Sequence, residues 1–349
     1  MKKLYTVIAL VIVAVLVLTA CGGAATPAPA TQPPAEKLKI GVVTDVGQLE
    51  DKSFNQASYE GAKAAAEAMG ADFEVIVTQN VSDYKQNIQT FIDQGFDTIV
   101  TVGFLIGSDT AAAAKANPNV KFIGVDQGIC VDEQGVSDPT FACKGDAAKL
   151  LPNYQGVVFA EEQPGYLAGI LAASISKTGV IGSVAGTKVP AVVAYIAGYE
   201  AGAKSVNPDI KTLTQEVNPD PAKGFNDPAT GKAIAQQFIG QGVLEAACDA
   251  NVYGIGVDVD QVETLPNLSK CIVTSAEKKL KDTVQAVTTT SAGSDFKAGT
   301  VVYNAASNPP AVGLSPYHDL ASLITPEIQA KIDEAFNAMK SGELNPPRQ

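Results

Sequence analysis

Apolar residues along the chain fall into short runs that alternate with longer stretches of helical character. The runs are nearly continuous in valine and isoleucine, as is typical of parallel strands covered on both faces. The expected strands are 38–45, 73–80, 98–104, 121–126, 156–160, 180–186, 210–217, 253–258, 271–276 and 301–306. The expected helices are 53–69, 82–94, 163–177, 190–205, 230–241, 277–290 and 326–341. This alternation predicts a doubly wound α/β fold.

The number of strands indicates more than one sheet. About ten strands are more than one doubly wound sheet usually carries, so we expect two parallel sheets and two lobes. We assign the N-lobe to 38–160 and 275–298 and the C-lobe to 161–274 and 299–349. In the first helix, Ser53 and Gln56 have the spacing of a capping box, and Gly70 is placed to end the helix.

Composition and charge exclude one class of partner. The 349 residues include 25 lysines and arginines against 37 acidic residues, which gives a formal net charge of −12. Nucleic-acid binding requires a basic face, so we expect no nucleic-acid partner.

Residues 1–21 are typical of a targeting segment. The basic start "MKK" precedes an apolar run, 4–18, that is short for a membrane span and ends in "LTAC". This junction resembles a bacterial lipobox, which implies signal-peptide cleavage before Cys21 and lipidation of its thiol. Residues 22–37 have the composition of a disordered tether. We expect an extracytoplasmic protein that is lipid-anchored to the cell membrane; the alternative is an uncleaved N-terminal anchor.

Four further cysteines are available for disulfides in such a compartment. Four cysteines allow three pairings, and we favour Cys130–Cys143 with Cys248–Cys271 because both pairs are local in the sequence. Their spacing does not match a zinc site.

Polar residues follow many of the expected strands. Because ligands of open parallel sheets bind beyond the carboxyl ends of the strands, these residues are candidates for a binding site. They are Asp45, Asn80, Phe104, Asp126, Asp258, and Ser275 with Lys278. Asp and Asn are also favoured in turns and helix caps, so each one alone has an equally good structural explanation.

Two aromatic residues strengthen the interpretation as a binding site. Phe54 and Phe104 stand on the same polar rim and are not turn residues. Aromatic faces suit a flat ligand, and carboxylates accept hydrogen bonds from hydroxyl groups such as those of a sugar. We therefore expect Phe54 to lie against a planar ring, with Asn55 and Asp45 at its polar edges. Packing of Phe54 onto the sheet is the alternative.

The sequence shows no catalytic signature. It lacks the common hydrolase, metalloprotease, P-loop and dinucleotide motifs, and His318, its only histidine, has no nucleophile placed beside it by a motif. We expect no enzyme activity, no cofactor and no metal site, and a structural role for His318.

Several segments in collinear order resemble the basic membrane protein (BMP) family of bacterial lipoproteins. They include "DKSFNQASYEGA", "KFIGVDQ", "FAEEQPGYLAGILAA", "YGIGVDVDQ" and "IVTSAEKKLKD". The resemblance covers roughly 38–340 and implies a substrate-binding subunit of an ABC importer, often one for purine nucleosides. It also implies a two-lobed type I periplasmic-binding fold with the ligand in the cleft between hinged lobes.

The resemblance assigns roles to particular residues. Asp45, Phe54 and Asn55 would contact the base, and Phe104 and Asp126 would line the same wall. From the other lobe, Tyr195 and Tyr199 would lie near the base, whereas Asp258 would bind ribose hydroxyls beside Lys278.

The chain departs from the family pattern after residue 242. The expected helix 230–241 runs into another helical piece, 243–249, with no strand between them. A βα repeat cannot be completed in this way, so the C-lobe is expected to lack one strand and its glycine-rich loop.

These observations predict a membrane-anchored receptor that delivers a purine-type nucleoside to ABC permease subunits. Two alternatives remain open. The same fold could bind another solute, such as a sugar or a signalling furanose, or the pocket could have been lost together with the missing strand.

Overall fold

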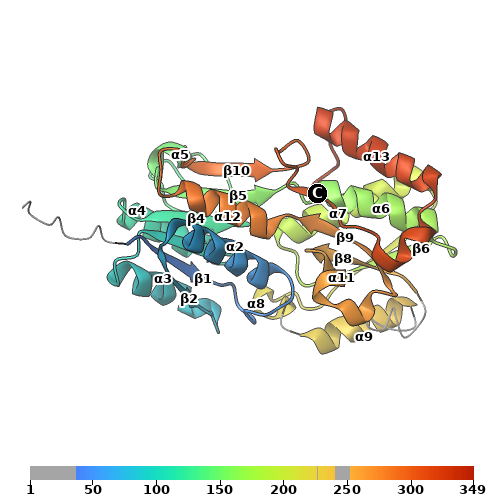
Figure 1. The fold of residues 1–349 in the computed structure, drawn as a ribbon, viewed down its shortest axis with the longest axis horizontal. Coiled ribbons are helices and arrows are strands. Elements are labelled where there is room, and N and C mark those ends of the chain that lie inside the picture. The colour runs from blue at the N-terminus through green and yellow to red at the C-terminus, as the bar shows by residue number, and fades with distance from the viewer. Residues whose placement is uncertain (1–36, 226, 240–251) are drawn as a thin grey trace, which may run out of the picture. The chain divides into compact units, whose positions relative to one another are not determined.

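The structure, a computed structural model, describes residues 37–225, 227–239 and 252–349. Its largest sheet has six parallel strands in the order β10-β5-β4-β3-β1-β2. These strands are β1 Lys39–Val43, β2 Asp72–Ile76, β3 Thr98–Val102, β4 Lys121–Val125, β5 Tyr154–Phe159 and β10 Gly299–Tyr303. The helical segments with them are α2 Phe54–Met69, η1 Val81–Asp83, α3 Tyr84–Asp93, α4 Gly107–Ala116, α5 Ala147–Leu150 and α12 Leu280–Thr290. Helices α2 and α12 lie side by side (Figure 1).

The side chains of each central strand alternate between two cores, one on each face of this sheet. In β1, Val42 packs in the cluster that includes residues of α2 and α12, whereas Val43 packs in the cluster that includes residues of α3 and α4. Ile123 and Phe122 of β4 divide between the two clusters in the same way. Apolar residues are therefore needed at successive positions, which explains why the Val/Ile runs predicted these parallel strands correctly.

The start of α2 differs from the expected capping box. Ser53 occupies the N-cap position, but its side chain makes no capping hydrogen bond. The carboxylate of Asp51 accepts hydrogen bonds from the backbone N–H groups of Ser53, Asn55 and Gln56 instead, at 2.8–3.1 Å. Capping through Asp51 leaves the Ser53 hydroxyl available for a contact outside the helix. The expected end at Gly70 is confirmed, since this residue has the left-handed conformation at φ 65°.

The remaining described strands form two smaller sheets. Strands β6 Val180–Ala185 and β7 Lys211–Glu216 pair in parallel. Strand β9 Ile272–Lys278 pairs in parallel with β8 Gly254–Asp258 and antiparallel with β11 Val312–Leu314. The helical segments here are α6 Glu162–Ile175, α7 Pro190–Val206, α8 Pro221–Gly224, α9 Pro228–Ile239, α11 Gln261–Thr264, η2 Pro266–Leu268, η3 His318–Leu323 and α13 Pro326–Ser341.

The second set of strands is divided in two, and the segment in which we expect one strand to be missing lies outside the described residues. Within the described ranges, no strand hydrogen-bonds the β6–β7 pair to the β8–β9–β11 group. The helical piece expected at 243–249 lies outside the described residues.

One expected lobe assignment has to be corrected. We placed 299–349 in the C-lobe, but β10 pairs with β5 at the edge of the six-stranded sheet. The three-residue strand β11 was not anticipated. Local apolar patterning reveals a strand but not the sheet that it joins, and this explains the wrong assignment.

The local disulfide expected between Cys130 and Cys143 is confirmed. Cys271 is also disulfide-bonded, but its expected partner Cys248 lies outside the described residues. Over the ranges that the structure describes, no helix is both long and apolar enough to cross a membrane.

Candidate functional site

The site is built where the β1–α2 loop meets the carboxyl end of β8. The hydroxyl of Ser53, which is not used for capping, donates to Asp258 Oδ2 at 3.2 Å. This bond joins residues 205 positions apart in the sequence and links the start of α2 to the end of β8. Segments from two different sheets therefore meet at one point.

Lys278 lies at the centre of this meeting point. Its side chain is only 3% exposed, and its ammonium group hydrogen-bonds Asp126 Oδ2. The same nitrogen lies 3.5 Å from Asp258 Oδ1 and 3.8 Å from Glu161 Oε1. One buried cation thus contacts carboxylates at or just after the carboxyl ends of β4, β5 and β8.

Three aromatic rings surround the same ammonium group. Its nitrogen lies 4.9 Å from the ring centroid of Phe54, 5.7 Å from that of Phe159 and 6.0 Å from that of Tyr195. The Tyr195 hydroxyl donates to the backbone oxygen of Ala276 at 3.2 Å, which fixes the ring against β9. Helix α7, which carries Tyr195, packs closely against α6 because Gly165 of α6 has no side chain. A Cβ at this position would lie 2.4 Å from the Tyr195 carbonyl oxygen.

The backbone positions the two aspartates at the carboxyl ends of their strands: Asp126 directly follows β4, and Asp258 is the last residue of β8. Asp126 and Asp258 both adopt left-handed conformations, at φ 57° and 69°. Asp tolerates this region better than most residues, and strained positions of this kind concentrate at binding sites. The second carboxylate oxygen of Asp126, Oδ1, is buried and has no hydrogen-bond partner. It is therefore an acceptor that a ligand hydroxyl or N–H group could satisfy.

Electrostatics keep Lys278 charged. Burial opposes the charge, but the carboxylates of Asp126, Asp258 and Glu161 outweigh it, and the pKa of Lys278 is raised above its ordinary value. Burial also raises the pKa of Glu161 to about 7, against the opposing effect of Lys278. The site therefore holds a permanent cation next to a carboxyl group that titrates near neutral pH.

Asp45 lies in the β1–α2 loop beside Asn55, next to the residues that surround Lys278. The Tyr84 hydroxyl and the backbone N–H of Val46 both donate to its Oδ1, and its own N–H donates to Asn55 Oδ1 at 3.2 Å. Gly103, at φ 99°, is required beside it because a Cβ there would lie 2.0 Å from Asp45 Oδ2. Burial raises the pKa of Asp45 to about 6. Asn55 thus orients the turn that carries Asp45.

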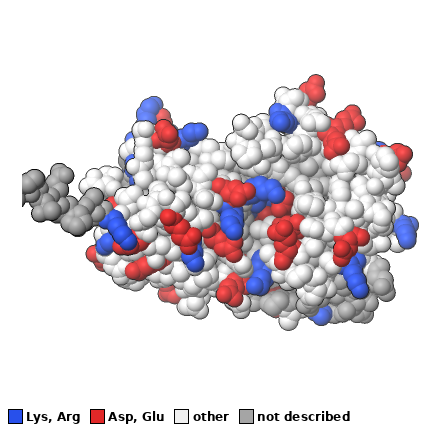
Figure 2. Space-filling model, viewed as in Figure 1, with Lys and Arg blue, Asp and Glu red and all other residues white. Residues whose placement is uncertain are grey.

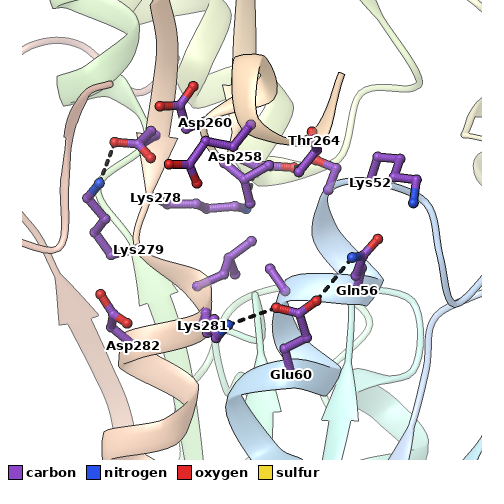
Figure 3. Close-up of a pocket in the computed structure, with 16 residues that line it drawn as sticks. Lys52, Gln56, Glu60, Asp258, Asp260, Thr264, Lys278, Lys279, Lys281 and Asp282 are labelled. Atoms are coloured by element: carbon purple, nitrogen blue, oxygen red, sulfur yellow. Dashed lines mark hydrogen bonds and ion pairs between the residues drawn. The ribbon is translucent and has the colours of Figure 1, made fainter. Parts of the chain in front are cut away.

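A cavity of about 280 Å³ opens beside the Lys278 cluster and shares Ser53, Asp258 and Lys278 with it. Figure 3 shows Lys278 and Asp258 along one side of the cavity, and Gln56, Glu60 and Lys281 along the other. Glu60 accepts hydrogen bonds from both Gln56 and Lys281 at 3.0 Å. The cavity therefore connects the buried cluster with the charged surface of α2 and α12.

The surface around the site carries charges of both signs. On the face shown in Figure 2, acidic and basic side chains are interspersed, and we see no large basic patch there. Over the described ranges, no group of three or more His, Cys, Asp or Glu side chains could hold a metal ion.

The structure brings some of the predicted site residues together but not all of them. Phe54, Asp126, Tyr195, Asp258 and Lys278 surround one point, and Asp45 with Asn55 stands beside them.

Three predicted positions lie elsewhere or outside the described part. Phe104 stacks on Phe141 of the disulfide loop, with ring centroids 6.4 Å apart, and Tyr199 packs against the cluster of Ala172 and Ile181. The expected lipidation site Cys21 lies outside the described residues.

Two site residues were missed by the sequence analysis. Phe159 is the last residue of β5, and Glu161 follows it by two positions, where the rule applied to the other strands would have found Glu161. His318 was expected to be structural, and its Nε2 lies 2.6 Å from Oδ2 of Asp260, a residue that lines the cavity.

Known proteins resemble this chain over most of its length. It is 29% identical over 343 residues to the "ABC transporter nucleoside-binding protein BmpA" of Lactococcus lactis, and 89% of each chain is covered. It is 30% identical over 274 residues to "Basic membrane protein B" of Borreliella burgdorferi, with 73% of each covered.

Solved structures show the same fold at lower identity. An ABC transporter solute-binding protein from Aeropyrum pernix has a TM-score of 0.73 at 23% identity, covering 89% of this chain and 94% of that one. A carbohydrate transporter solute-binding protein from Agrobacterium radiobacter, solved with D-arabinose, has a TM-score of 0.55 at 17% identity, covering 85% and 99%. The expected two-lobed α/β binding-protein fold is confirmed.

A family model matches most of the sequence as well. The Bmp model, described as "ABC transporter substrate-binding protein PnrA-like", matches residues 38–335. This range includes the motifs noted in the sequence and the residues that surround Lys278. The chain therefore belongs to the Bmp family of PnrA-like ABC transporter substrate-binding proteins.

Proposed function

We propose that this substrate-binding protein takes up a purine-type nucleoside at the Lys278 cluster and presents it to an ABC permease. The observation that carries the proposal is the buried ammonium of Lys278, which lies over Phe54 and between Asp126 and Asp258. An aromatic face suits a planar base, and carboxylates suit the two adjacent hydroxyls of a ribose. The nucleoside-binding relative from Lactococcus lactis supports the same class of ligand.

Each side of the cluster has a proposed role. Phe54 stacks on the base, and Asp45 and Asn55 contact the polar edge of the base through hydrogen bonds. Asp258 and Lys278 bind the ribose hydroxyls, and the unpartnered oxygen of Asp126 accepts one further hydrogen bond from the ligand.

The aromatic residues farther out have supporting roles in this proposal. Tyr195 closes the site from α7, where its ring faces Lys278. Phe104 extends the wall toward the disulfide loop, and Tyr199 packs one helical turn behind Tyr195.

Binding works through closure. The Ser53–Asp258 bond and the Lys278 ion pairs already connect segments of different sheets. A ligand that contacts Phe54 on one side and Asp258 on the other stabilises the closed arrangement, because it adds contacts that the open arrangement lacks.

Delivery to a permease requires that the protein stay at the outer side of the cell membrane. Substrate-binding proteins of ABC transporters work outside the cytoplasm. We propose that a lipid on Cys21 anchors the protein to the cell membrane and that residues 22–37 act as a tether.

Isothermal titration calorimetry with inosine, guanosine and adenosine tests the ligand. We expect saturable binding of at least one of them, and a loss of at least about tenfold in Phe54→Ala, because a stacked aromatic face is removed. Phe73→Ala is the matched control: this half-buried phenylalanine of β2 contacts Tyr59, with ring centroids 5.6 Å apart, and is not among the residues that line the cavity, so its replacement should leave the affinity unchanged.

Two results would refute the nucleoside assignment. Binding of D-arabinose or another free sugar in preference to every nucleoside would support the sugar alternative. Absence of heat with nucleosides and sugars alike would support a lost pocket.

A further inference from the structure

The basic residues of this chain are distributed unevenly between lysine and arginine. The sequence contains 25 lysines and arginines, and Arg348 is the only arginine among them. Arginine differs from lysine in its planar fork of donors, which can hold two carboxylates or a carboxylate and a carbonyl at once. Where this single arginine lies is therefore informative.

Arg348 returns from the C-terminal segment to the connection between β5 and α6. Figure 1 shows the C-terminus beside α6, to which the chain returns after the end of α13. Nη1 donates to the backbone oxygen of Phe159 at 3.1 Å and to Glu162 Oε2 at 2.7 Å. Nη2 donates to Glu161 Oε2 at 3.0 Å. One side chain thus contacts the last residue of β5 and the two residues that begin the path into α6.

These contacts lead directly to the ligand cluster. Glu161 is 2% exposed, and its other oxygen, Oε1, lies 3.8 Å from the ammonium of Lys278. Glu161 therefore bridges two cations, one in the C-terminal segment and one in the site. The β5–α6 connection also links the six-stranded sheet with the helices that cover the smaller sheets, so a clamp here acts where the two halves join.

We propose that Arg348 is a positioning residue for the binding site: it clamps the β5–α6 connection, keeps Glu161 and Glu162 ionised, and through Glu161 holds Lys278 in place. The clamp is independent of the ligand's identity, whereas its effect on affinity rests on the proposed nucleoside function.

The pH dependence of stability follows from the groups that face these carboxylates. Glu161 faces Lys278 on β9, Asp126 after β4 and Arg348, and the charged group in contact with Glu162 is Arg348. Burial raises the pKa of Glu161 from 4.5 to about 7, and it also raises that of Glu162. A carboxyl group with a raised pKa in the folded state lowers stability as pH rises from its unfolded to its folded pKa. Without Arg348 both folded pKa values rise further, so the loss of stability must extend to higher pH.

Urea unfolding of the ligand-free protein between pH 5 and pH 9 tests the clamp. In Arg348→Gln we expect the fall in unfolding midpoint to continue about one pH unit beyond that of the wild type. Arg348→Lys keeps the charge but loses the fork, so it should restore most of the wild-type pH profile. Lys340→Gln removes an exposed positive charge from the end of α13 and should leave the profile unchanged.

The same experiment in a variant without the two carboxylates shows whether they cause the pH-dependent effect of Arg348→Gln. When Glu161 and Glu162 are both changed to Gln, adding Arg348→Gln should alter stability equally at every pH. If the pH-dependent difference persists in that background, or if Arg348→Gln shifts the midpoint equally at every pH in the wild-type background, the clamp is refuted.

Calorimetry with inosine at pH 7.5 tests the link to the site. We expect Arg348→Gln to weaken inosine binding by about fivefold or more, with partial recovery in Arg348→Lys and no change in Lys340→Gln. If the wild type binds no nucleoside, the proposed function fails, and the ligand-free pH profiles still decide the role of Arg348. An unchanged affinity in Arg348→Gln, with a binding wild type, overturns its role in positioning Lys278.

Discussion

The ammonium group of Lys278 is buried between carboxylates of three different segments and beneath the ring of Phe54. Burial of a cation is unfavourable unless it is paired and hydrogen-bonded, and here the pairing also connects different sheets. The same residue therefore contributes to the fold and, in the proposed function, offers its charge to a polar ligand.

Replacement of Lys278 by methionine should destabilise the ligand-free protein strongly. The change removes the ammonium group from Asp126 and Asp258 and leaves Glu161 paired with Arg348 alone. Breaking a buried pair in this way typically costs about 3–5 kcal/mol of unfolding free energy. Urea unfolding at pH 7 measures this cost. Lys281→Met is the matched control, because its pair with Glu60 is exposed and should be worth at most about 1 kcal/mol. Equal costs for the two variants would show that the cluster does not stabilise the fold.

Asp45 should make stability fall as pH rises through mildly acidic values. Its pKa is 3.8 in the unfolded chain and about 6 in the folded protein because of burial. The folded state therefore binds the extra proton between these values, and stability decreases from about pH 4 to pH 6. Asp45→Asn removes this titration, so its unfolding midpoint relative to the wild type should rise over that interval. A difference that stays constant from pH 4 to pH 6 would contradict the raised pKa.

Among the elements, α2 shows how capping and binding share a short loop. Asp51 satisfies the first N–H groups of the helix, and Ser53 reaches across to Asp258. The motif "DKSFNQ" thus combines a cap, a bridge and an aromatic face in six consecutive residues. The cap and the bridge can be separated by mutation.

Asp51→Ala should cost about 1–2 kcal/mol of unfolding free energy, because three backbone N–H groups lose their acceptor. Ser53→Ala should cost less, since its hydroxyl does not cap the helix. Denaturant unfolding of both variants decides between the two residues. A larger loss in Ser53→Ala than in Asp51→Ala would restore the capping box expected from the sequence.

The β6–β7 pair should be the less stable sheet. Its strand β7 is largely exposed, whereas every residue of β3 in the six-stranded sheet is buried. Two strands without further neighbours are only marginally stable, so opening should need less free energy there. Hydrogen–deuterium exchange followed by mass spectrometry should show faster exchange in 180–185 and 211–216 than in 98–102. Equal protection of these segments would show that the small sheet is held by other means.

At the scale of the whole molecule, the sequence predicted the class of fold and several of the residues that gather around Lys278. Val/Ile runs with two buried faces identify parallel strands, and the rule that ligands bind after such strands selected Asp126, Asp258 and Lys278. The membership of β10 in the six-stranded sheet was not predictable in this way, because sheet order depends on contacts distant in the sequence. Glu161 was not predicted because its importance comes from its contact with Lys278, which is distant in the sequence. Arg348 was not predicted because it stands in a C-terminal segment that has no strand or helix pattern.

Native mass spectrometry of the protein with an excess of inosine tests the central claim most directly. The proposal that one planar nucleoside is held jointly by Phe54 and Asp258 predicts that the wild-type spectrum gains a single adduct of the mass of inosine. The adduct should disappear in Phe54→Ala and in Asp258→Ala, and it should persist in Phe73→Ala. A wild-type spectrum that shows only the polypeptide mass, or an adduct that survives both site variants, would contradict binding at this cluster.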